Sequence, residues 1–124
     1  MTASSILLVD DDPDLRALLQ RQLSQAGYDV IACEDAFVAR DKLGERVPDL
    51  ILVDINMPQV SGVELVAGLR EDPALAAIPV IYITALEENT ELAVKTLGFP
   101  LLSKPVRARE LLALVERQLR PKAA

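Results

Sequence analysis

Short, almost wholly apolar segments alternate along this chain with longer segments in which apolar residues recur at helical spacing. The apolar segments Ser5–Val9, Leu50–Val53 and Val80–Thr84 lack the polar alternation of a strand that faces solvent on one side. Such segments are typical of parallel strands that are covered on both faces. We therefore predict that they form the centre of a parallel sheet.

Two further segments predict the outer strands. Residues Tyr28–Cys33 mix polar with apolar side chains, which indicates an edge strand, and Leu101–Ser103 is a short fifth strand. Between the strands, leucines at spacings of three and four residues predict a helix over 13–26, which Asp12 caps and Pro13 begins. The same reasoning predicts helices at about 35–45, 62–71, 88–97 and 107–120.

This alternation predicts an α/β fold, a doubly wound five-stranded parallel sheet flanked by five helices. Short connections between strand and helix favour right-handed crossovers, and the simplest strand order is then 2-1-3-4-5. In such a sheet, ligands bind beyond the carboxyl ends of the strands, where the strand order reverses between strands 1 and 3. The residues that follow these strands are therefore the candidates for function.

Length and composition limit the classes of protein that remain. The 124 residues, 51% of them apolar, suit one compact domain over 1–124, and we expect no output domain in this chain. The single Cys33 excludes an internal disulfide, and the absence of histidine excludes Ser-His-Asp and Cys-His catalysis. No apolar segment approaches the roughly 20 residues that span a bilayer, so we expect a cytoplasmic protein that does not bind membranes.

The charge is acidic overall but uneven along the chain. A formal charge of −6 argues against nucleic-acid binding by this chain alone. Residues 104–124 nevertheless carry six basic and two acidic side chains. These basic residues either complement the carboxyl end of the last helix or form a docking surface.

Polar side chains end or directly follow four of the predicted strands. Because the carboxyl ends of parallel strands meet at one edge, we expect these side chains to converge. Asp12 has a simpler role as the helix cap. The converging set is Asp10, Asp11, Asp54, Thr84 and Lys104.

This set is suited to phosphoryl chemistry. Three carboxylates in one crevice repel one another unless a cation is present, and Mg²⁺ prefers oxygen ligands that it shares with a phosphate. Lys104 and Thr84 offer an ammonium and a hydroxyl to the same phosphoryl oxygens. Asp54, at the centre of the crevice, is the candidate nucleophile, since an aspartate can form an aspartyl-phosphate.

With these residues in place, the chain resembles a known family, the receiver domain of two-component response regulators. The fold of that family is flavodoxin-like. The resemblance covers nearly the whole length. It rests on residues 8–12 (Leu-Val-Asp-Asp-Asp), residues 54–58 (Asp-Ile-Asn-Met-Pro) followed by Gly62, the pair Thr84-Ala85, and the pair Lys104-Pro105.

The resemblance implies a role for each of these residues. Asp54 accepts a phosphoryl group from a histidine on a partner kinase or phosphotransfer protein, and Thr84 and Lys104 contact that group. Asp11 binds Mg²⁺, or Mn²⁺ as a substitute, directly and Asp10 binds it through water. The backbone carbonyl of Asn56 is a further ligand, and Asp54 completes the metal site. Lys104-Pro105 is expected in the cis form.

The family also implies a downstream protein target, and a homodimer through the face made by helix 4, strand 5 and helix 5. One departure concerns this output face. The residue three before Lys104, normally Tyr or Phe, is Leu101, and Phe99 lies too early to replace that ring on the strand. We expect intact phosphorylation chemistry with an altered aromatic switch.

Two alternatives remain at this stage. One is a receiver-like interaction module that is never phosphorylated, which Leu101 favours and the complete set of site residues opposes. The other is a flavin-binding electron carrier on a similar sheet, which the acidic residues after strand 1 and the scarcity of aromatic residues oppose.

Overall fold

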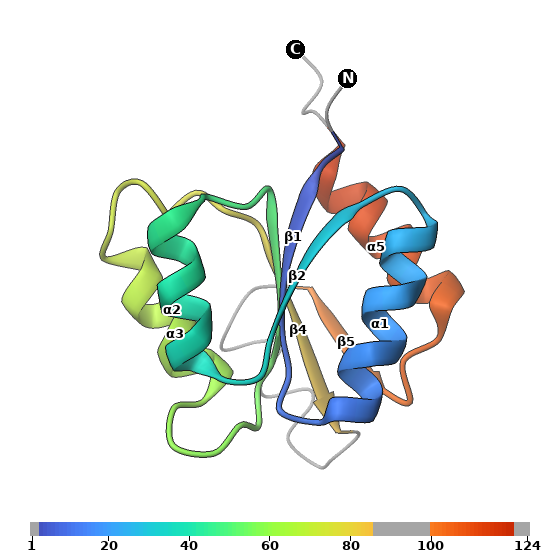
Figure 1. Cartoon of the computed structure of the whole chain (residues 1–124), viewed down its shortest axis with the longest axis horizontal. Helices are drawn as coiled ribbons and strands as arrows, with labels where there is room; N and C mark the ends of the chain where they lie inside the picture. The colour runs from blue at the N-terminus through green and yellow to red at the C-terminus, as the bar shows by residue number, and fades with distance from the viewer. Residues whose placement is uncertain (1–2, 86–99, 121–124) are drawn as a thin grey trace.

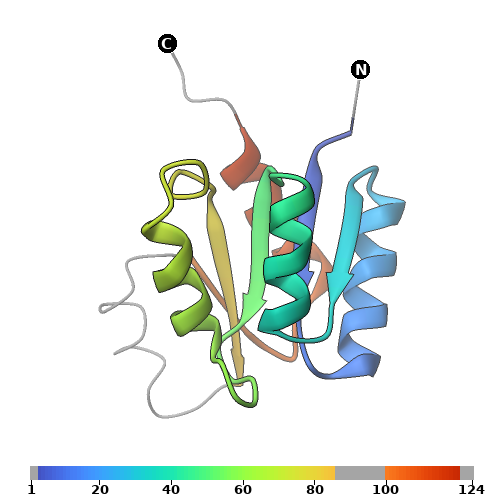
Figure 2. The ribbon, with the colours of Figure 1, turned by 60° about the vertical axis from the view of Figure 1, so that its left-hand side comes forward.

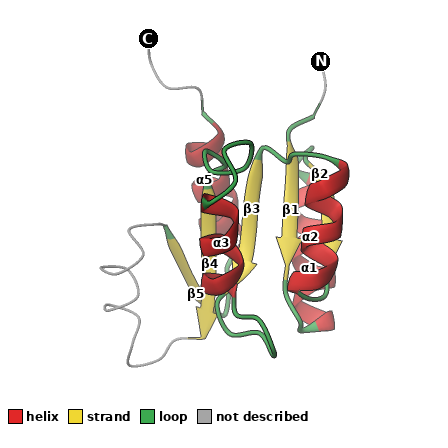
Figure 3. Cartoon of the chain, turned by 90° about the vertical axis from the view of Figure 1, so that its left-hand side faces the viewer, coloured by secondary structure: helices red, strands yellow, loops and turns green. Residues whose placement is uncertain are grey.

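The computed structural model describes residues 3–85 and 100–120, and within them it has the predicted parallel sheet. The strands are β1 (Ser5–Val9), β2 (Asp29–Cys33), β3 (Leu50–Asp54), β4 (Val80–Ala85) and β5 (Leu101–Lys104). They pair in the order β2-β1-β3-β4-β5, and every pair is parallel (Figures 1 and 3). The predicted order is confirmed, and the edge strand predicted at Tyr28–Cys33 is β2, which begins one residue later at Asp29.

Four helices lie within the described residues. They are α1 (Pro13–Gln25), α2 (Ala36–Glu45), α3 (Gly62–Arg70) and α5 (Ala108–Leu119). The predicted helix at 88–97 lies outside the described residues, as does Phe99. Helices α2 and α3 cover one face of the sheet, and α1 and α5 cover the other (Figures 1 and 2).

The core has two layers because successive strand residues point to opposite faces of the sheet. On one face, Leu7, Val53 and Tyr82 pack against α2 and α3. On the other face, Leu8, Leu52 and Ile83 belong to the cluster that includes α1 and α5 residues. Burying each such side chain contributes roughly 1.5–3 kcal/mol, so both faces stabilise the scaffold that carries the strand ends.

Side-chain caps fix where three of the helices begin. Asp12 accepts hydrogen bonds from the first turn of α1, as predicted, and Asp35 and Ser61 do the same for α2 and α3. These bonds satisfy amide groups that a helix leaves without partners at its start. Each cap lies shortly after a strand, so the caps also fix the loops at the carboxyl edge of the sheet.

At the opposite, amino edge of the sheet, one aspartate joins two strands. The Oδ2 atom of Asp49 accepts hydrogen bonds from the backbone N–H of Ser5 at 2.8 Å and from its hydroxyl at 3.3 Å. The N–H of Asp49 in turn donates to the carbonyl of Ser5 at 2.9 Å. This reciprocal set fixes the register of β1 and β3 at their first residues.

Among the helices of residues 3–85 and 100–120, none combines the length and the apolar character that crossing a bilayer requires.

Candidate functional site

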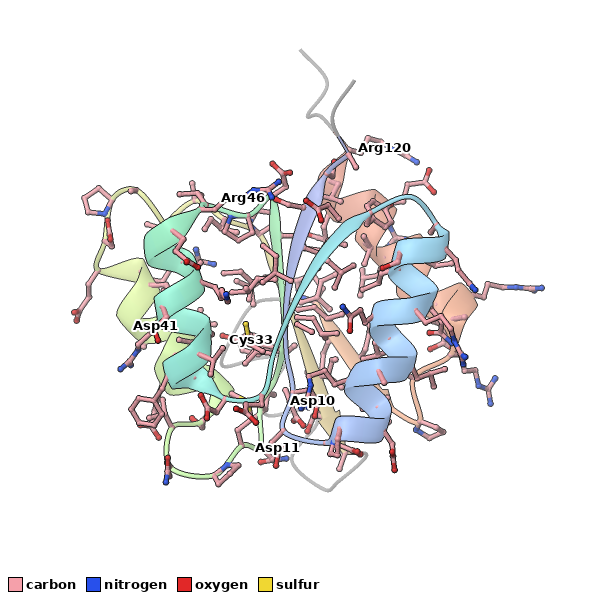
Figure 4. All side chains as sticks on the ribbon, viewed as in Figure 1. Asp10, Asp11, Cys33, Asp41, Arg46 and Arg120 are labelled. Atoms are coloured by element: carbon pink, nitrogen blue, oxygen red, sulfur yellow. The ribbon has the colours of Figure 1, made fainter. Side chains whose placement is uncertain are left out.

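Three carboxylates gather at the carboxyl edge of the sheet. Asp10, Asp11 and Asp54 each offer one oxygen, and these oxygens lie within 4.8 Å of one another. They meet because Val9 and Val53 are paired in register, so the residues that follow them are neighbours. Asp10 and Asp54 are buried, whereas Asp11 is exposed at the start of the β1–α1 turn. Figure 4 shows Asp10 and Asp11 next to each other at this turn.

Only one of the two carboxylate oxygens of Asp10 has a hydrogen-bond partner. Its Oδ1 atom accepts a hydrogen bond from the N–H of Asp12 at 2.9 Å, but its Oδ2 atom is buried without a hydrogen-bond partner. Burial raises the pKa of Asp10 to about 6, and the nearby charge of Asp54 also raises it. A buried carboxylate oxygen without a partner is costly and suits a bound cation, directly or through water.

Asp54 has a partner for each carboxylate oxygen. Its Oδ2 atom lies 2.8 Å from the Nζ atom of Lys104, and its Oδ1 atom accepts a 2.9 Å hydrogen bond from the N–H of Asn56. Burial alone lowers the pKa of Lys104, but its hydrogen bond to Asp54 and the charges of Asp54 and Asp10 raise that pKa above its usual value. Lys104 therefore stays cationic beside the buried carboxylate.

The predicted cis peptide bond between Lys104 and Pro105 is confirmed. It follows the last residue of β5 directly.

Thr84 lies at this edge without binding the carboxylates. It is buried near the end of β4, and its hydroxyl donates to the backbone carbonyl of Ala85 at 3.2 Å. On the neighbouring strand, Asp54 pairs with Ile83. Thr84 is therefore the residue after Ile83, the β4 partner of Asp54. Its hydroxyl is hydrogen-bonded to the backbone of Ala85 and not to the carboxylates.

The loop after Asp54 is tightly constrained. Gln59 has a φ of +70°, and the N–H of Val60 donates to the carbonyl of Pro58 at 2.8 Å, which is the pattern of a γ-turn. A Cβ atom on Gly62 would lie 2.3 Å from the carbonyl oxygen of Asp54, so only glycine fits there. This loop therefore packs directly on the backbone of the central site residue.

Two residues of this region were missed by the sequence reasoning. Arg16 on α1 donates a 2.8 Å hydrogen bond from Nη1 to the carbonyl of Asp10. Its place four residues after the Asp12 cap could have suggested this contact, because helical side chains lean toward the amino end of the helix. Tyr82 is the β4 partner of Leu101 and is buried in the core cluster against which Leu101 packs. An aromatic ring therefore lies on β4 beside the leucine of β5.

Comparison with known proteins identifies relatives that match nearly the whole chain. A family model described as the response regulator receiver domain matches residues 6–116. The phosphate regulon transcriptional regulatory protein PhoB of Pseudomonas aeruginosa is 34% identical over 122 residues, which cover 97% of this chain and 53% of that protein. The chain thus spans about half the length of this relative.

Solved structures agree with the sequence relatives. The chemotaxis protein CheY4 of Vibrio cholerae is similar with a TM-score of 0.86 at 28% identity, covering 95% of this chain and 100% of that chain. A putative response regulator from Chloroflexus aurantiacus is similar with a TM-score of 0.88 at 27% identity, covering 95% and 98%.

Proposed function

The chain belongs to the response regulator receiver family, and we propose that it relays a signal by accepting a phosphoryl group on Asp54. Proteins with this domain act in two-component signalling and are generally signalling proteins, not enzymes. The observation that carries the proposal is the environment of Asp54. This buried carboxylate is held by Lys104 at 2.8 Å and lies among two further carboxylates, one with a buried oxygen that lacks a partner.

The donor set fits a hard divalent cation. All of its side-chain ligands are carboxylates, and the unpartnered Oδ2 of Asp10 offers a ready position. We expect Asp10, Asp11, Asp54 and the backbone carbonyl of Asn56 to hold Mg²⁺, with Mn²⁺ as a substitute. When bound, the cation neutralises charge as an anionic donor approaches the carboxylates.

The residues of the chain supply the remaining steps. One oxygen of Asp54 attacks the phosphorus of a phosphohistidine on the partner, an oxygen–phosphorus bond forms, and the phosphorus–nitrogen bond breaks. Its electron pair returns to the ring nitrogen, and the histidine, which carries a proton on its other ring nitrogen, leaves as a neutral imidazole. Lys104 and the hydroxyl of Thr84 contact the phosphoryl oxygens, so Thr84 must turn away from its present partner, the Ala85 carbonyl. Water later hydrolyses the acyl phosphate at the same site.

The chain then acts as a switch for binding partners. Its donor is a histidine kinase or a histidine phosphotransfer protein, and its phosphorylated form binds a downstream protein. The proposed homodimer face includes β5, α5 and the segment 88–97, and this last part lies outside the described residues. A monomer at all concentrations, with and without phosphorylation, would contradict the homodimer.

The competing function is a docking module that is never phosphorylated. Leu101 favours it, because the ring that reports phosphorylation in the family is absent from β5. Replacing Leu101→Tyr tests this point, since an equal dependence of partner binding on phosphorylation in both forms would show that the ring is unimportant. Tyr82 already fills space beside Leu101, so the added ring has a buried aromatic neighbour.

The deciding experiment measures the intact mass of the purified chain after incubation with Mg²⁺ and acetyl phosphate. We expect wild type to gain one acid-stable, base-labile phosphoryl group, and expect none on Asp54→Ala or without metal. The exposed Asp41→Ala on α2 is the matched control and should be labelled as wild type. If wild type binds Mg²⁺ but stays unlabelled, a phosphorylated histidine protein is the next donor. If it takes up neither, the docking module is the better function.

A further inference from the structure

A guanidinium group holds the backbone of the turn that carries the first two carboxylates. Nη1 of Arg16 donates to the Asp10 carbonyl at 2.8 Å, from a half-buried position on α1. That carbonyl lies one residue beyond Val9, the last residue of β1 that pairs with β2 and β3. A hydrogen bond from a charged donor is roughly twice as strong as one between neutral groups. Arg16 thus fixes the peptide group just past the end of the strand.

This peptide group determines where Asp11 points. The plane between residues 10 and 11 sets the direction of the Cα–Cβ bond of Asp11. Within the described residues, the exposed Asp11 side chain makes no hydrogen bond or ion pair of its own. Its approach to Asp10 and Asp54 therefore depends on the backbone of the turn. Arg16 holds that backbone on one side of Asp11, and the Asp12 cap of α1 holds it on the other.

We propose that Arg16 is a positioning residue of the divalent-cation site, which sets Mg²⁺ affinity by holding the Asp10 carbonyl so that the carboxylates of Asp10 and Asp11 face one point. The proposal rests on the proposed function only in taking this cluster as the Mg²⁺ site. Arg16 touches neither the cation nor the phosphoryl group. Its effect passes through the backbone of the β1–α1 turn.

Charge and position predict opposite effects when Arg16 is removed. The guanidinium is a cation near the site, so by charge alone its removal strengthens Mg²⁺ binding. By position, its removal frees the Asp10–Asp11 peptide group and weakens Mg²⁺ binding. Loss of a residue that orients metal ligands typically lowers metal affinity 10- to 100-fold. The sign of the change therefore separates the two effects.

The test is a calorimetric titration of Mg²⁺ alone into wild type, Arg16→Met, Arg16→Lys and Arg21→Met. Arg21 is exposed on the same helix, so Arg21→Met is the matched control for loss of charge. We expect the Mg²⁺ dissociation constant to rise about 10-fold in Arg16→Met, to rise less in Arg16→Lys, and to stay unchanged in Arg21→Met. Unchanged or tighter binding in both Arg16 variants overturns the proposal. If Arg16→Met fails to fold in thermal melting, Arg16→Lys carries the test.

A second readout separates positioning from a general loss of structure. In acetyl phosphate labelling, we expect Arg16→Lys to need more Mg²⁺ for half-maximal rate, with the rate at saturating Mg²⁺ near that of wild type. A lower rate at saturating Mg²⁺ with no shift in the Mg²⁺ requirement contradicts the positioning role. If wild type binds Mg²⁺ but is labelled neither by acetyl phosphate nor by a phosphorylated histidine protein, the proposed function fails, while the titrations still decide the role of Arg16.

Discussion

The two edges of the sheet each hold an aspartate, but the carboxylate of one is hydrogen-bonded to a neighbouring strand and that of the other keeps a buried oxygen without a partner. At the amino edge, Asp49 accepts hydrogen bonds from both the N–H and the hydroxyl of Ser5, and its own N–H donates back to Ser5. At the carboxyl edge, Asp10 is more deeply buried yet keeps one oxygen without a partner, beside two other carboxylates. The amino edge is built for stability, whereas the carboxyl edge carries an electrostatic cost that a ligand can relieve.

We expect the largest effect from a substitution that removes the cationic side chain at the carboxyl edge. Lys104→Met leaves Asp54 buried without its ammonium partner and takes a positive charge from the phosphoryl site. Loss of one such electrostatic donor typically lowers the rate about 100- to 1000-fold. We expect a fall of that size in the rate of acetyl phosphate labelling at saturating Mg²⁺. Lys42→Met, which removes a half-exposed ammonium on α2, should leave the rate unchanged, and an equal fall in both variants would contradict a specific role of Lys104.

The next effect follows from the raised pKa of Asp10, about 6 against an ordinary 3.8. Between these values the folded chain binds a proton that the unfolded chain has released, so metal-free stability falls as pH rises through this window. We expect the Asp10 contribution to recover on the order of 2 kcal/mol when metal-free protein is taken from neutral pH to about pH 4.

The measurement compares urea unfolding of wild type and Asp10→Asn at both pH values without metal. The free energy of unfolding of Asp10→Asn should not rise in this way on acidification. At neutral pH, the variant should be more stable than wild type. A parallel pH dependence of the two proteins would show that Asp10 carries no such cost.

At the amino edge, loss of the aspartate should lower stability, whereas Asp10→Asn should raise it at neutral pH. Asp49→Ala removes the acceptor for two hydrogen bonds of Ser5, so we expect a loss of about 1–3 kcal/mol in the free energy of unfolding. Denaturant unfolding measures this loss, and Mg²⁺ affinity should not change. Asp29→Ala is the control, because its ion pair with Arg46 is half-exposed and such pairs contribute roughly 0–1 kcal/mol.

The smallest effect concerns backbone strain in the loop after Asp54. Gln59 has positive φ, which glycine adopts without the steric cost that a Cβ atom brings. We expect Gln59→Gly to change the free energy of unfolding by at most about 1 kcal/mol, in the stabilising direction, with unchanged labelling of Asp54. A clear loss of stability would show that the glutamine side chain contributes more than its backbone costs.

The hydrophobic pattern alone predicted much of this molecule. Buried parallel strands must be apolar on both faces, so Ser5–Val9 was placed with its observed bounds, and the strand order followed from short crossovers. Convergence of Asp10, Asp11, Asp54 and Lys104 followed from the shared edge. The site could be located because topology, not side-chain detail, brings these residues together.

The features that the sequence did not predict are individual side-chain contacts and local backbone conformations. Asp10 and Asp54 have the same side chain and nearly the same burial, yet only Asp54 contacts Lys104, and no spacing rule distinguishes them. The turn at Gln59 was missed because glutamine is not a residue that favours positive φ. The orientation of the Thr84 hydroxyl toward Ala85 is equally a local choice that strand periodicity does not determine.

The ion pair between Asp54 and Lys104 joins residues 50 positions apart, and this has a consequence for the growing chain. Synthesis proceeds from the amino terminus, so the carboxylates that follow β1 and end β3 leave the ribosome well before β5 does. Until Lys104 emerges, bringing those strand ends together sets negative charges against one another without the compensating ammonium. The acidic edge therefore opposes the pairing of β1 with β3 in a chain that has not yet reached β5, and Lys104 then supplies the compensating charge.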